Sequence, residues 1–238
     1  MLSIIIPIHR ERDLLEVNLH KLLAYLNSLQ NEIDFEIIIV DNGMESYIND
    51  TLTKMPKVKL INIEKRGLGL ALKTGLSESR GDYLIFYAID LPFGLNIIKE
   101  SVEEATLRNY DLVLGSKGHK DSVVNVNYWR KIISYLLNYL IRLLYKLDIR
   151  DTQGSFLISR DLYNKIKYFI TSDSAWAQAQ IVIYSHLING RIAELPIKYT
   201  DIRSGSKMVF SDGVKYIYEM LWEIQKKNKY ARSTKNFG

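Results

Sequence analysis

Apolar strands that alternate with amphipathic helices fill the first 115 residues, and this alternation restricts the possible folds more than any other feature. The sequence predicts buried strands at residues 2–7, 35–40, 58–63, 83–87 and 110–114. Helices are predicted between them, at 13–29, 67–79 and 96–109. This order is typical of an α/β domain, in which helices cover both faces of a mostly parallel sheet.

Polar and turn residues follow three of these strands, at positions 7–11, 41–43 and 88–90. In open α/β sheets, ligands bind in the crevice outside the carboxyl ends of the strands. We therefore expect a binding site where these three strand ends meet.

The second half of the chain has a different pattern. It predicts polar loops at 116–127 and 151–155, a strand at 156–159, helices at 128–147, 174–187 and 213–229, and a basic loop at 201–207. A strand at 192–199 contains Pro196, which lacks an N–H group and therefore favours a sheet edge. Because no linker-like segment separates the halves, residues 1–238 are expected to form a single domain.

The composition excludes several classes of function. The chain has no cysteine, which excludes disulfides, thiolate zinc sites and cysteine nucleophiles. The net charge of +5 suits a phosphate-bearing ligand or an anionic membrane surface. Because the basic residues are dispersed and form no nucleic-acid motif, nucleic acid is not expected as a partner. No signal-peptide core is expected, and Arg142 and Lys146 interrupt the most apolar long stretch, so no transmembrane helix is expected either.

Two features of the first half could bind a phosphate or a metal ion. Gly67 and Gly69 follow a strand and open a helix, where backbone N–H groups could meet a phosphate; close packing is the alternative explanation for these glycines. Asp90 ends a strand and could hold a divalent cation such as Mg²⁺; the alternative is an ordinary turn residue.

Two basic groups stand out in the second half. Arg130 and Ser134 lie four residues apart on a predicted helix, so they share a face that could bind a phosphate. Arg203 and Lys207 flank Gly205 in a loop that could close over a diphosphate. In both cases the alternative is a solvated basic surface.

Taken in order, these motifs resemble those of family 2 glycosyltransferases with the GT-A fold, and most of all the dolichol-phosphate mannose synthase branch. Residues 3–11 resemble the opening strand and its P-x-Y-N-E turn, and residues 36–43 resemble a strand that ends in V-D-D-G-S. Residues 66–81 resemble the G-L-G-x-A-x-x-x-G segment. Further matches lie at 111–117 (D-I-V-x-G-S-R), 129–138 (R-K-I-I-S-x-x-x-N), 151–156 (D-x-T-G-S-F), 194–197 (E-V-P-I) and 206–208 (S-K-L).

The resemblance implies a fold, a reaction and partners. The fold would be a GT-A α/β domain in which residues 1–115 bind a nucleotide-sugar donor and residues 116–238 bind the acceptor. The reaction would be inverting transfer of a hexose from a nucleotide-diphosphate sugar, of the GDP-mannose or UDP-glucose type, to a polyprenyl or dolichyl phosphate. The expected location is cytoplasmic and peripheral at the membrane, and a membrane-protein partner or a homo-oligomer is compatible with it.

The resemblance also implies roles for individual residues. Donor binding is expected at Pro7, His9, Glu11, Asp41, Gly67, Gly69 and Asp90. The acceptor phosphate is expected at Lys117, Arg130 and Ser134. Catalytic roles are expected for Asp90, Asp151, Arg203 and Lys207. Asp90 would also be the ligand of a Mg²⁺ or Mn²⁺ ion.

The sequence departs from the family pattern near the expected reacting centre. The metal motif D-A-D reads Ala88-Ile89-Asp90, so its first carboxylate is absent, and Gln180 stands where the family has an acidic residue. One interpretation is an enzyme with reduced metal dependence, in which Arg203 and Lys207 supply part of the positive charge. The alternative is a degenerate subunit that binds nucleotide, lipid or a partner without catalysis.

The helix predicted at 129–147 is expected to lie on a membrane surface. Its apolar residues are Ile132, Ile133, Leu136, Leu137, Leu140, Ile141 and Leu144. Its basic residues, which could meet anionic head groups, are Arg130, Lys131, Arg142 and Lys146. The alternative is a helix whose apolar side chains pack in the core.

Overall fold

The structure is a computed structural model and describes residues 1–9, 12–29, 32–43, 55–126, 128–200 and 216–224. The strands are β1 (Leu2–Ile8), β2 (Phe35–Asp41), β3 (Val58–Asn62), β4 (Tyr83–Phe86), β5 (Leu112–Ser116), β6 (Val123–Asn125), β7 (Phe156–Ser159), β8 (Ile192–Pro196) and β9 (Lys198–Thr200). The helices are α1 (Arg12–Ser28), α3 (Leu68–Glu78), α4 (Asn96–Leu107), α5 (Tyr128–Tyr145), α6 (Arg160–Ile166) and α7 (Trp176–Leu187), with a 3₁₀ turn at Lys167–Phe169 and a further helix over 216–224.

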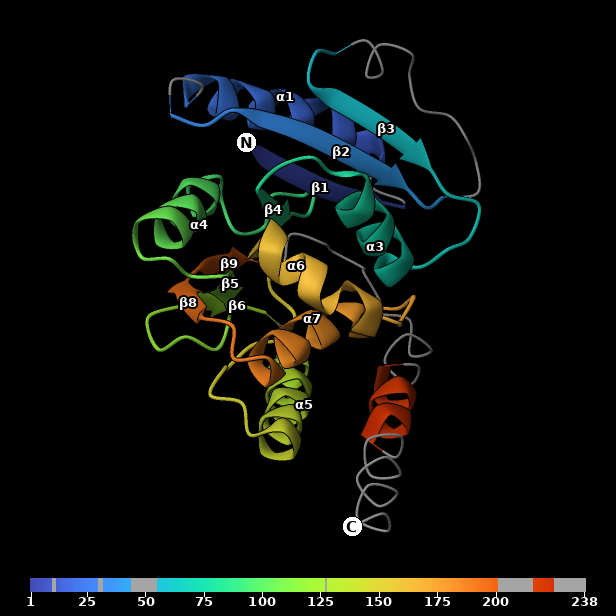
Figure 1. Ribbon diagram of the computed structural model, residues 1–238, viewed down its shortest axis with the longest axis vertical. Helices are drawn as coiled ribbons and strands as arrows, with labels where there is room; N and C mark the ends of the chain where they lie inside the picture. The colour runs from blue at the N-terminus through green and yellow to red at the C-terminus, as the bar shows by residue number, and fades with distance from the viewer. Residues whose placement is uncertain (10–11, 30–31, 44–54, 127, 201–215, 225–238) are drawn as a thin grey trace.

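The predicted mostly parallel sheet is confirmed. Within the described residues, seven strands follow the order β3-β2-β1-β4-β7-β5-β8. Figure 1 shows β3, β2, β1 and β4 side by side in this order. β7 runs antiparallel to both of its neighbours, β4 and β5, whereas the other pairings in this sheet are parallel. The α/β interpretation of the sequence is therefore correct.

Helices cover both faces of the sheet, and β1 shows why its sequence is a continuous apolar run. Successive side chains of a strand point to opposite faces. Ile5 packs into a core that α3, α5, α6 and α7 close, while Ile4 and Ile6 pack into a second core that α1 and α4 close. All three isoleucines are fully buried, so both faces of this strand contribute to a core.

The second half of the chain differs from the prediction in three places. Residues 192–199 form two strands rather than one: β8 is the edge of the large sheet, as Pro196 indicated, and β9 pairs with β6 in a separate two-stranded sheet. β6 lies within the segment 116–127. The prediction that this whole segment is a polar loop is therefore partly wrong. α6 was not predicted. Each of these elements is short, and its sequence pattern is correspondingly weak.

The two ends of the molecule carry different elements. In the orientation of Figure 1, β1, β2, β3 and α1 lie toward the top, whereas α5 and the helix over 216–224 lie at the bottom. Of the residues that the sequence predicted to be functional, Pro7, Asp90 and Lys117 lie where β1, β4 and β5 finish.

Candidate active site

A cavity of about 210 Å³ lies at the carboxyl ends of β1 and β4. Its lining comes from elements far apart in the sequence: Pro7, Leu68, Phe86, Ala88, Ile89, Asp90, Pro92, Phe93, Lys117, Gln153, Gly154, Ser155, Gln178 and Tyr199. The expectation that the ends of β1 and β4 meet at one site is thus met for Pro7 and Asp90. Lys117, which was expected at the acceptor phosphate, lines the same cavity.

The turn that carries Asp90 is held in place by contacts from two directions. From α1, the Asn18 side-chain amide donates to the Ile89 carbonyl, with 2.9 Å between nitrogen and oxygen. From the loop at 151–155, the Ser155 hydroxyl donates to the Phe86 carbonyl at 2.6 Å. Both contacts are buried, so the carboxylate at the end of β4 stands on a rigid support.

Asp151 anchors Lys117. The Lys117 Nζ lies 2.9 Å from Asp151 Oδ2, and the backbone N–H of Lys117 donates to the same oxygen at 3.0 Å. The backbone N–H of Gln153 donates to Oδ1 at 3.0 Å. Burial raises the pKa of the Asp151 carboxyl, but the Lys117 ammonium and these hydrogen bonds outweigh it, so the pKa lies below its ordinary value.

This arrangement gives Asp151 a positioning role. Its side chain is only 2% exposed and both oxygens already accept hydrogen bonds, so the geometry offers no support for contact with reacting atoms. Lys117, by contrast, keeps 22% of its side chain exposed and faces the cavity. Its ammonium group can therefore meet an anionic ligand while Asp151 fixes its position.

The other expected donor residues lie around the ends of β1 and β2. Asp41 is paired with Ile8 in the sheet and is 1% exposed, and its Oδ1 accepts the N–H of Gly43 at 2.8 Å. His9 follows β1 and is half-buried. Neither residue lines the cavity, so Asp41 and His9 border the site rather than form its wall. Glu11 lies outside the described residues.

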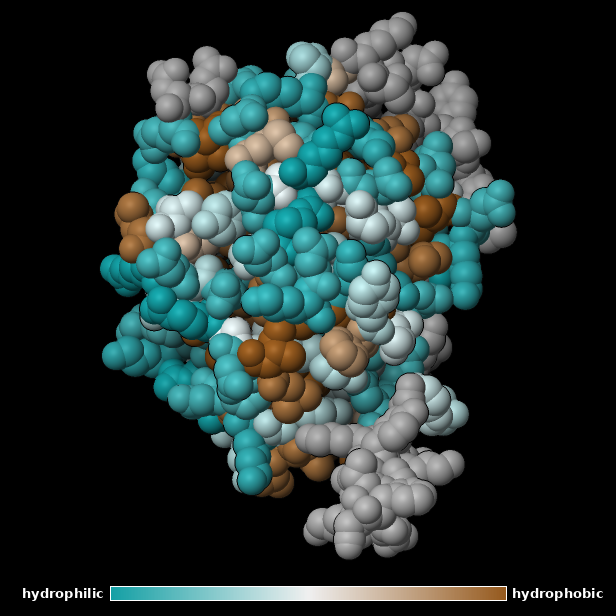
Figure 2. Space-filling model, in the orientation of Figure 1, coloured by the Kyte–Doolittle hydropathy of each residue, from teal (hydrophilic) through white to brown (hydrophobic). Residues whose placement is uncertain are grey.

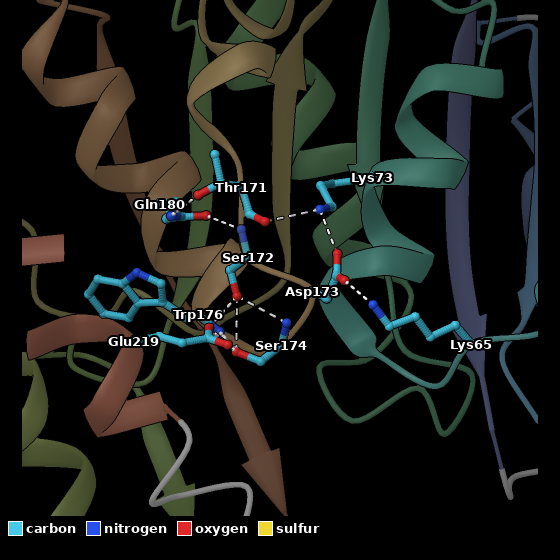
Figure 3. A network of polar contacts seen from close by, with 9 residues as sticks. All are labelled: Lys65, Lys73, Thr171, Ser172, Asp173, Ser174, Trp176, Gln180 and Glu219. Carbon is cyan, nitrogen blue, oxygen red and sulfur yellow. Dashed lines mark hydrogen bonds and ion pairs between the residues drawn. The ribbon is translucent and has the colours of Figure 1, made fainter. Parts of the chain in front are cut away.

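Gly67 and Gly69 are explained by close packing against the backbone of residues 172–174. Figure 3 shows this segment, in which Asp173 pairs with Lys65 and Lys73. A Cβ atom at either glycine would lie 2.4 Å from a backbone oxygen, that of Asp173 for Gly67 and that of Ser174 for Gly69. The N–H of Gly69 donates to the Asp173 carbonyl at 3.0 Å and is therefore not available to a phosphate in this arrangement. The packing alternative accounts for both glycines, and their contact with a donor stays a prediction.

Replacing Gly69 by alanine is expected to lower the free energy of unfolding by about 1–3 kcal/mol, because the added methyl group overpacks a backbone contact. Urea denaturation measures the change. Gly115→Ala is the control, since a Cβ there meets nothing closer than 3.2 Å, and it is expected to cost less. Equal stability of wild type and Gly69→Ala would contradict the packing explanation.

The residues expected at the acceptor phosphate are described only in part. Ser134 is half-buried in α5, and Arg130 belongs to the first turn of the same helix, although its side chain is outside the described part of the structure. Arg203 and Lys207 lie outside the described residues altogether. The charge that these two residues would contribute therefore stays a prediction.

Gln180 lies away from the cavity and has a structural role. It is 2% exposed, its Oε1 accepts the N–H of Ser172 at 3.0 Å, and its amide donates to Glu223 at 2.9 Å. Gln178, two residues earlier, lines the cavity and donates to the Gly154 carbonyl at 3.4 Å. The sequence analysis did not single out Gln178; its nearest signal was Gln180, which stands where the family has an acidic residue.

The residues present fit a metal ion that is shared with a ligand, not one held by protein alone. Asp90 is the one carboxylate among the described residues that line the cavity, and the described residues contain no group of three His, Cys, Asp or Glu side chains that could hold a metal. Mg²⁺ is commonly held by one or two carboxylates together with phosphate oxygens. A single Asp90 meets the lower limit of that requirement.

Comparison with known proteins identifies the family. The sequence model of glycosyl transferase family 2 matches residues 3–167. The chain belongs to this family. It is 27% identical over 232 residues to the human dolichyl-phosphate beta-glucosyltransferase, covering 87% of this chain and 69% of that protein. It is 23% identical over 203 residues to the glycosyltransferase AglD of Haloferax volcanii, covering 83% of this chain and 32% of AglD.

Solved structures support the GT-A fold of this family 2 glycosyltransferase. Glucosyl-3-phosphoglycerate synthase from Mycobacterium tuberculosis, solved with uridine diphosphate, superposes with a TM-score of 0.70 at 15% identity, over 94% of this chain and 80% of that chain. The expected fold is therefore confirmed. Membership in the family likewise supports an enzyme over the alternative of a subunit without catalysis.

Proposed function

We propose that this glycosyltransferase transfers a hexose from a nucleotide-diphosphate sugar to a polyprenyl phosphate at the cytoplasmic face of a membrane. The observation that carries the proposal is the cavity in which Asp90, at the end of β4, and Lys117, anchored by Asp151, line the same space. The Asp90 carboxylate could hold a metal ion bound to the donor diphosphate, and the fixed Lys117 ammonium could bind the anionic acceptor phosphate. The names of the relatives supply the chemical class of the acceptor.

The reaction needs little from an acid–base group. An oxygen of the acceptor phosphate attacks the anomeric carbon from the face opposite the leaving diphosphate, so a bond from carbon to the acceptor oxygen forms as the bond to the diphosphate breaks. Because the attacking phosphate is already an anion, no side chain has to remove a proton. Lys117 orients that anion, and a bound Mg²⁺ or Mn²⁺ near Asp90 would neutralise charge on the departing diphosphate.

A transfer assay tests the proposal. Wild-type protein is incubated with UDP-glucose or GDP-mannose and a polyprenyl phosphate, with and without Mn²⁺ or Mg²⁺, and the glycolipid is measured. We expect transfer from one of the two donors. If neither donor gives a glycolipid under any metal condition, the proposed function is wrong.

Asp41→Ala is expected to weaken nucleoside diphosphate binding by about tenfold, because the edge of the base that Asp41 would meet is left unpaired, which costs roughly 1–3 kcal/mol. Isothermal titration calorimetry with UDP and GDP measures the effect. Asp41→Asn is the control, since it keeps an oxygen for the N–H of Gly43 and so separates the shape of the turn from its charge. If wild type binds neither nucleotide, the donor site is placed incorrectly.

The apolar residues of α5 are divided between two faces. Ile141 is fully buried in the core, and Leu137 and Leu140 pack against it. Ile133 and Leu136, by contrast, are more than half exposed. The exposed face also carries Tyr128, Tyr135, Tyr139 and Leu143. The core alternative therefore holds for one face only. In Figure 2, a hydrophobic patch lies in the lower half of the molecule, and other hydrophobic side chains lie near its top and sides.

We propose that this exposed face rests on the membrane that holds the acceptor. Lys131 on α5 and Lys146, which directly follows the helix, are exposed and suit anionic head groups. None of the helices in the described ranges is long and apolar enough to cross a membrane. Contact in the plane of the interface is the mode that this helix fits.

The double substitution Leu136→Glu/Leu143→Glu is expected to reduce binding to anionic liposomes by roughly tenfold or more, since each buried leucine is worth about 1.5–3 kcal/mol. Flotation of liposomes measures the bound fraction. Val17→Glu is the control, because Val17 is 57% exposed on α1, toward the opposite end of the molecule. Wild-type protein that stays with the soluble fraction would count against membrane contact.

A further inference from the structure

Asn138 joins α5 to the loop at 151–155. Its Oδ1 accepts two hydrogen bonds from Thr152, from the backbone N–H at 3.0 Å and from the hydroxyl at 2.9 Å. Its Nδ2 donates to the Ser134 carbonyl, one turn earlier in α5, at 3.0 Å. The side chain is only 8% exposed, so a buried amide uses both of its ends in fixed directions.

An asparagine at this position is not explained by helix formation or by packing. Asparagine favours a helix interior less than leucine does, and a buried amide is costly unless its hydrogen bonds are made. Its neighbours Leu137 and Ile141 make apolar contacts with the core, which a leucine at 138 would extend. The amide instead fixes one specific contact, that between α5 and Thr152.

This contact connects the two elements that carry the expected acceptor groups. Thr152 follows Asp151, which anchors Lys117. Ser134 precedes Asn138 by four residues on α5, so these two share one face of the helix, and Arg130 stands a further four positions toward its amino end. The path from the face of α5 to the Lys117 ammonium thus runs through Asn138, Thr152 and Asp151.

We propose that Asn138 is a positioning residue that sets the distance between Lys117 and the face of α5, and thereby the affinity for the acceptor phosphate. The proposal rests on the proposed function, because it assigns that face and Lys117 to one phosphate group. An anion held between two separate elements binds well only when their spacing is fixed beforehand. Asn138 has no contact with the donor or the acceptor in this proposal. It acts by holding α5 against Thr152, next to the Asp151 that anchors Lys117.

The experiment compares kinetic constants for donor and acceptor. In Asn138→Ala, the KM for polyprenyl phosphate is expected to rise roughly tenfold, since a displacement of about 1 Å is enough for effects of this size and larger. The donor KM is expected to stay within about twofold of wild type. Thr152→Val is expected to raise the KM for polyprenyl phosphate as well. Thr152→Ser is expected to keep both KM values close to wild type, because serine, unlike valine, retains the hydroxyl that donates to Asn138.

Ser79→Ala is the control for lost stability alone. Ser79 is buried, donates to the Leu76 carbonyl at 2.6 Å and accepts from Arg160 at 2.8 Å, close to the amino end of β4 and away from the cavity. It is expected to leave both KM values unchanged. Equal increases of donor and acceptor KM in Asn138→Ala, or no increase in either, would overturn the positioning role.

Binding of farnesyl phosphate without donor separates this inference from the proposed function. Calorimetry is expected to show weaker binding to Asn138→Ala than to wild type, and equal binding overturns the inference whether or not transfer is observed. A wild-type protein that neither binds farnesyl phosphate nor transfers sugar to a polyprenyl phosphate overturns the proposed function, and the acceptor role of Asn138 with it.

Discussion

Asp151→Ala is expected to lower the free energy of unfolding by about 3 kcal/mol and to reduce transfer by on the order of a hundredfold, because it leaves the Lys117 ammonium without its buried counter-charge. The expected loss of stability is at the lower end for a buried pair, since Lys117 keeps partial contact with solvent. Urea denaturation and the transfer assay measure the two effects. A loss of less than about 1 kcal/mol would contradict the anchoring role, since even an unmet buried hydrogen bond costs about that much.

A double variant separates stability from chemistry. Lys117→Met/Asp151→Asn removes both charges, and replacing both partners of a buried pair is far less costly than removing one. It is expected to recover at least half of the lost stability, while transfer stays at the level of Asp151→Ala because the fixed cation is absent. Recovery of transfer together with stability would mean that Lys117 does not meet a substrate.

The strands and their polar ends could be predicted because the relevant pattern is local. A run such as Ile4–Ile6 is buried on both faces, and the carboxyl ends of parallel strands must meet at one edge. Pro7 and Asp90 come together at the cavity for this reason. Lys117 followed from the resemblance of its motif, and its presence in the same cavity came only from the structure.

The supporting contacts could not be predicted in this way. Asn138 and Thr152 are 14 residues apart, Lys117 and Asp151 are 34 apart, and Gln178 meets Gly154 across 24. No periodic pattern links such pairs, since each depends on how separate elements pack. For the same reason the sequence left the glycine turn open between phosphate binding and packing, and the close approach of residues 172–174 supports packing.

The missing carboxylate at position 88 leads to the second large effect. Ala88 is half-buried and lines the cavity together with Asp90, so an aspartate there places a second carboxylate beside the first. Without a cation, two neighbouring carboxylates repel each other, and with a divalent ion they share it. Ala88→Asp should therefore be slightly less stable than wild type in a chelator and gain more stability from Mn²⁺ with nucleoside diphosphate.

We expect Ala88→Asp to bind Mn²⁺ in the presence of nucleoside diphosphate roughly 10–100-fold more tightly than wild type. Residues that only hydrogen-bond to metal ligands already change metal affinity by about this factor, and a direct ligand should do at least as much. Transfer rate against Mn²⁺ concentration should saturate correspondingly earlier, and thermal melting reports the same affinity without catalysis. Ala88→Asn adds an oxygen without charge and should gain less, whereas Asp90→Ala should lose the Mn²⁺ response. If wild type already binds Mn²⁺ as tightly as Ala88→Asp does, another group completes the metal site. The missing carboxylate at position 88 would then not weaken metal binding.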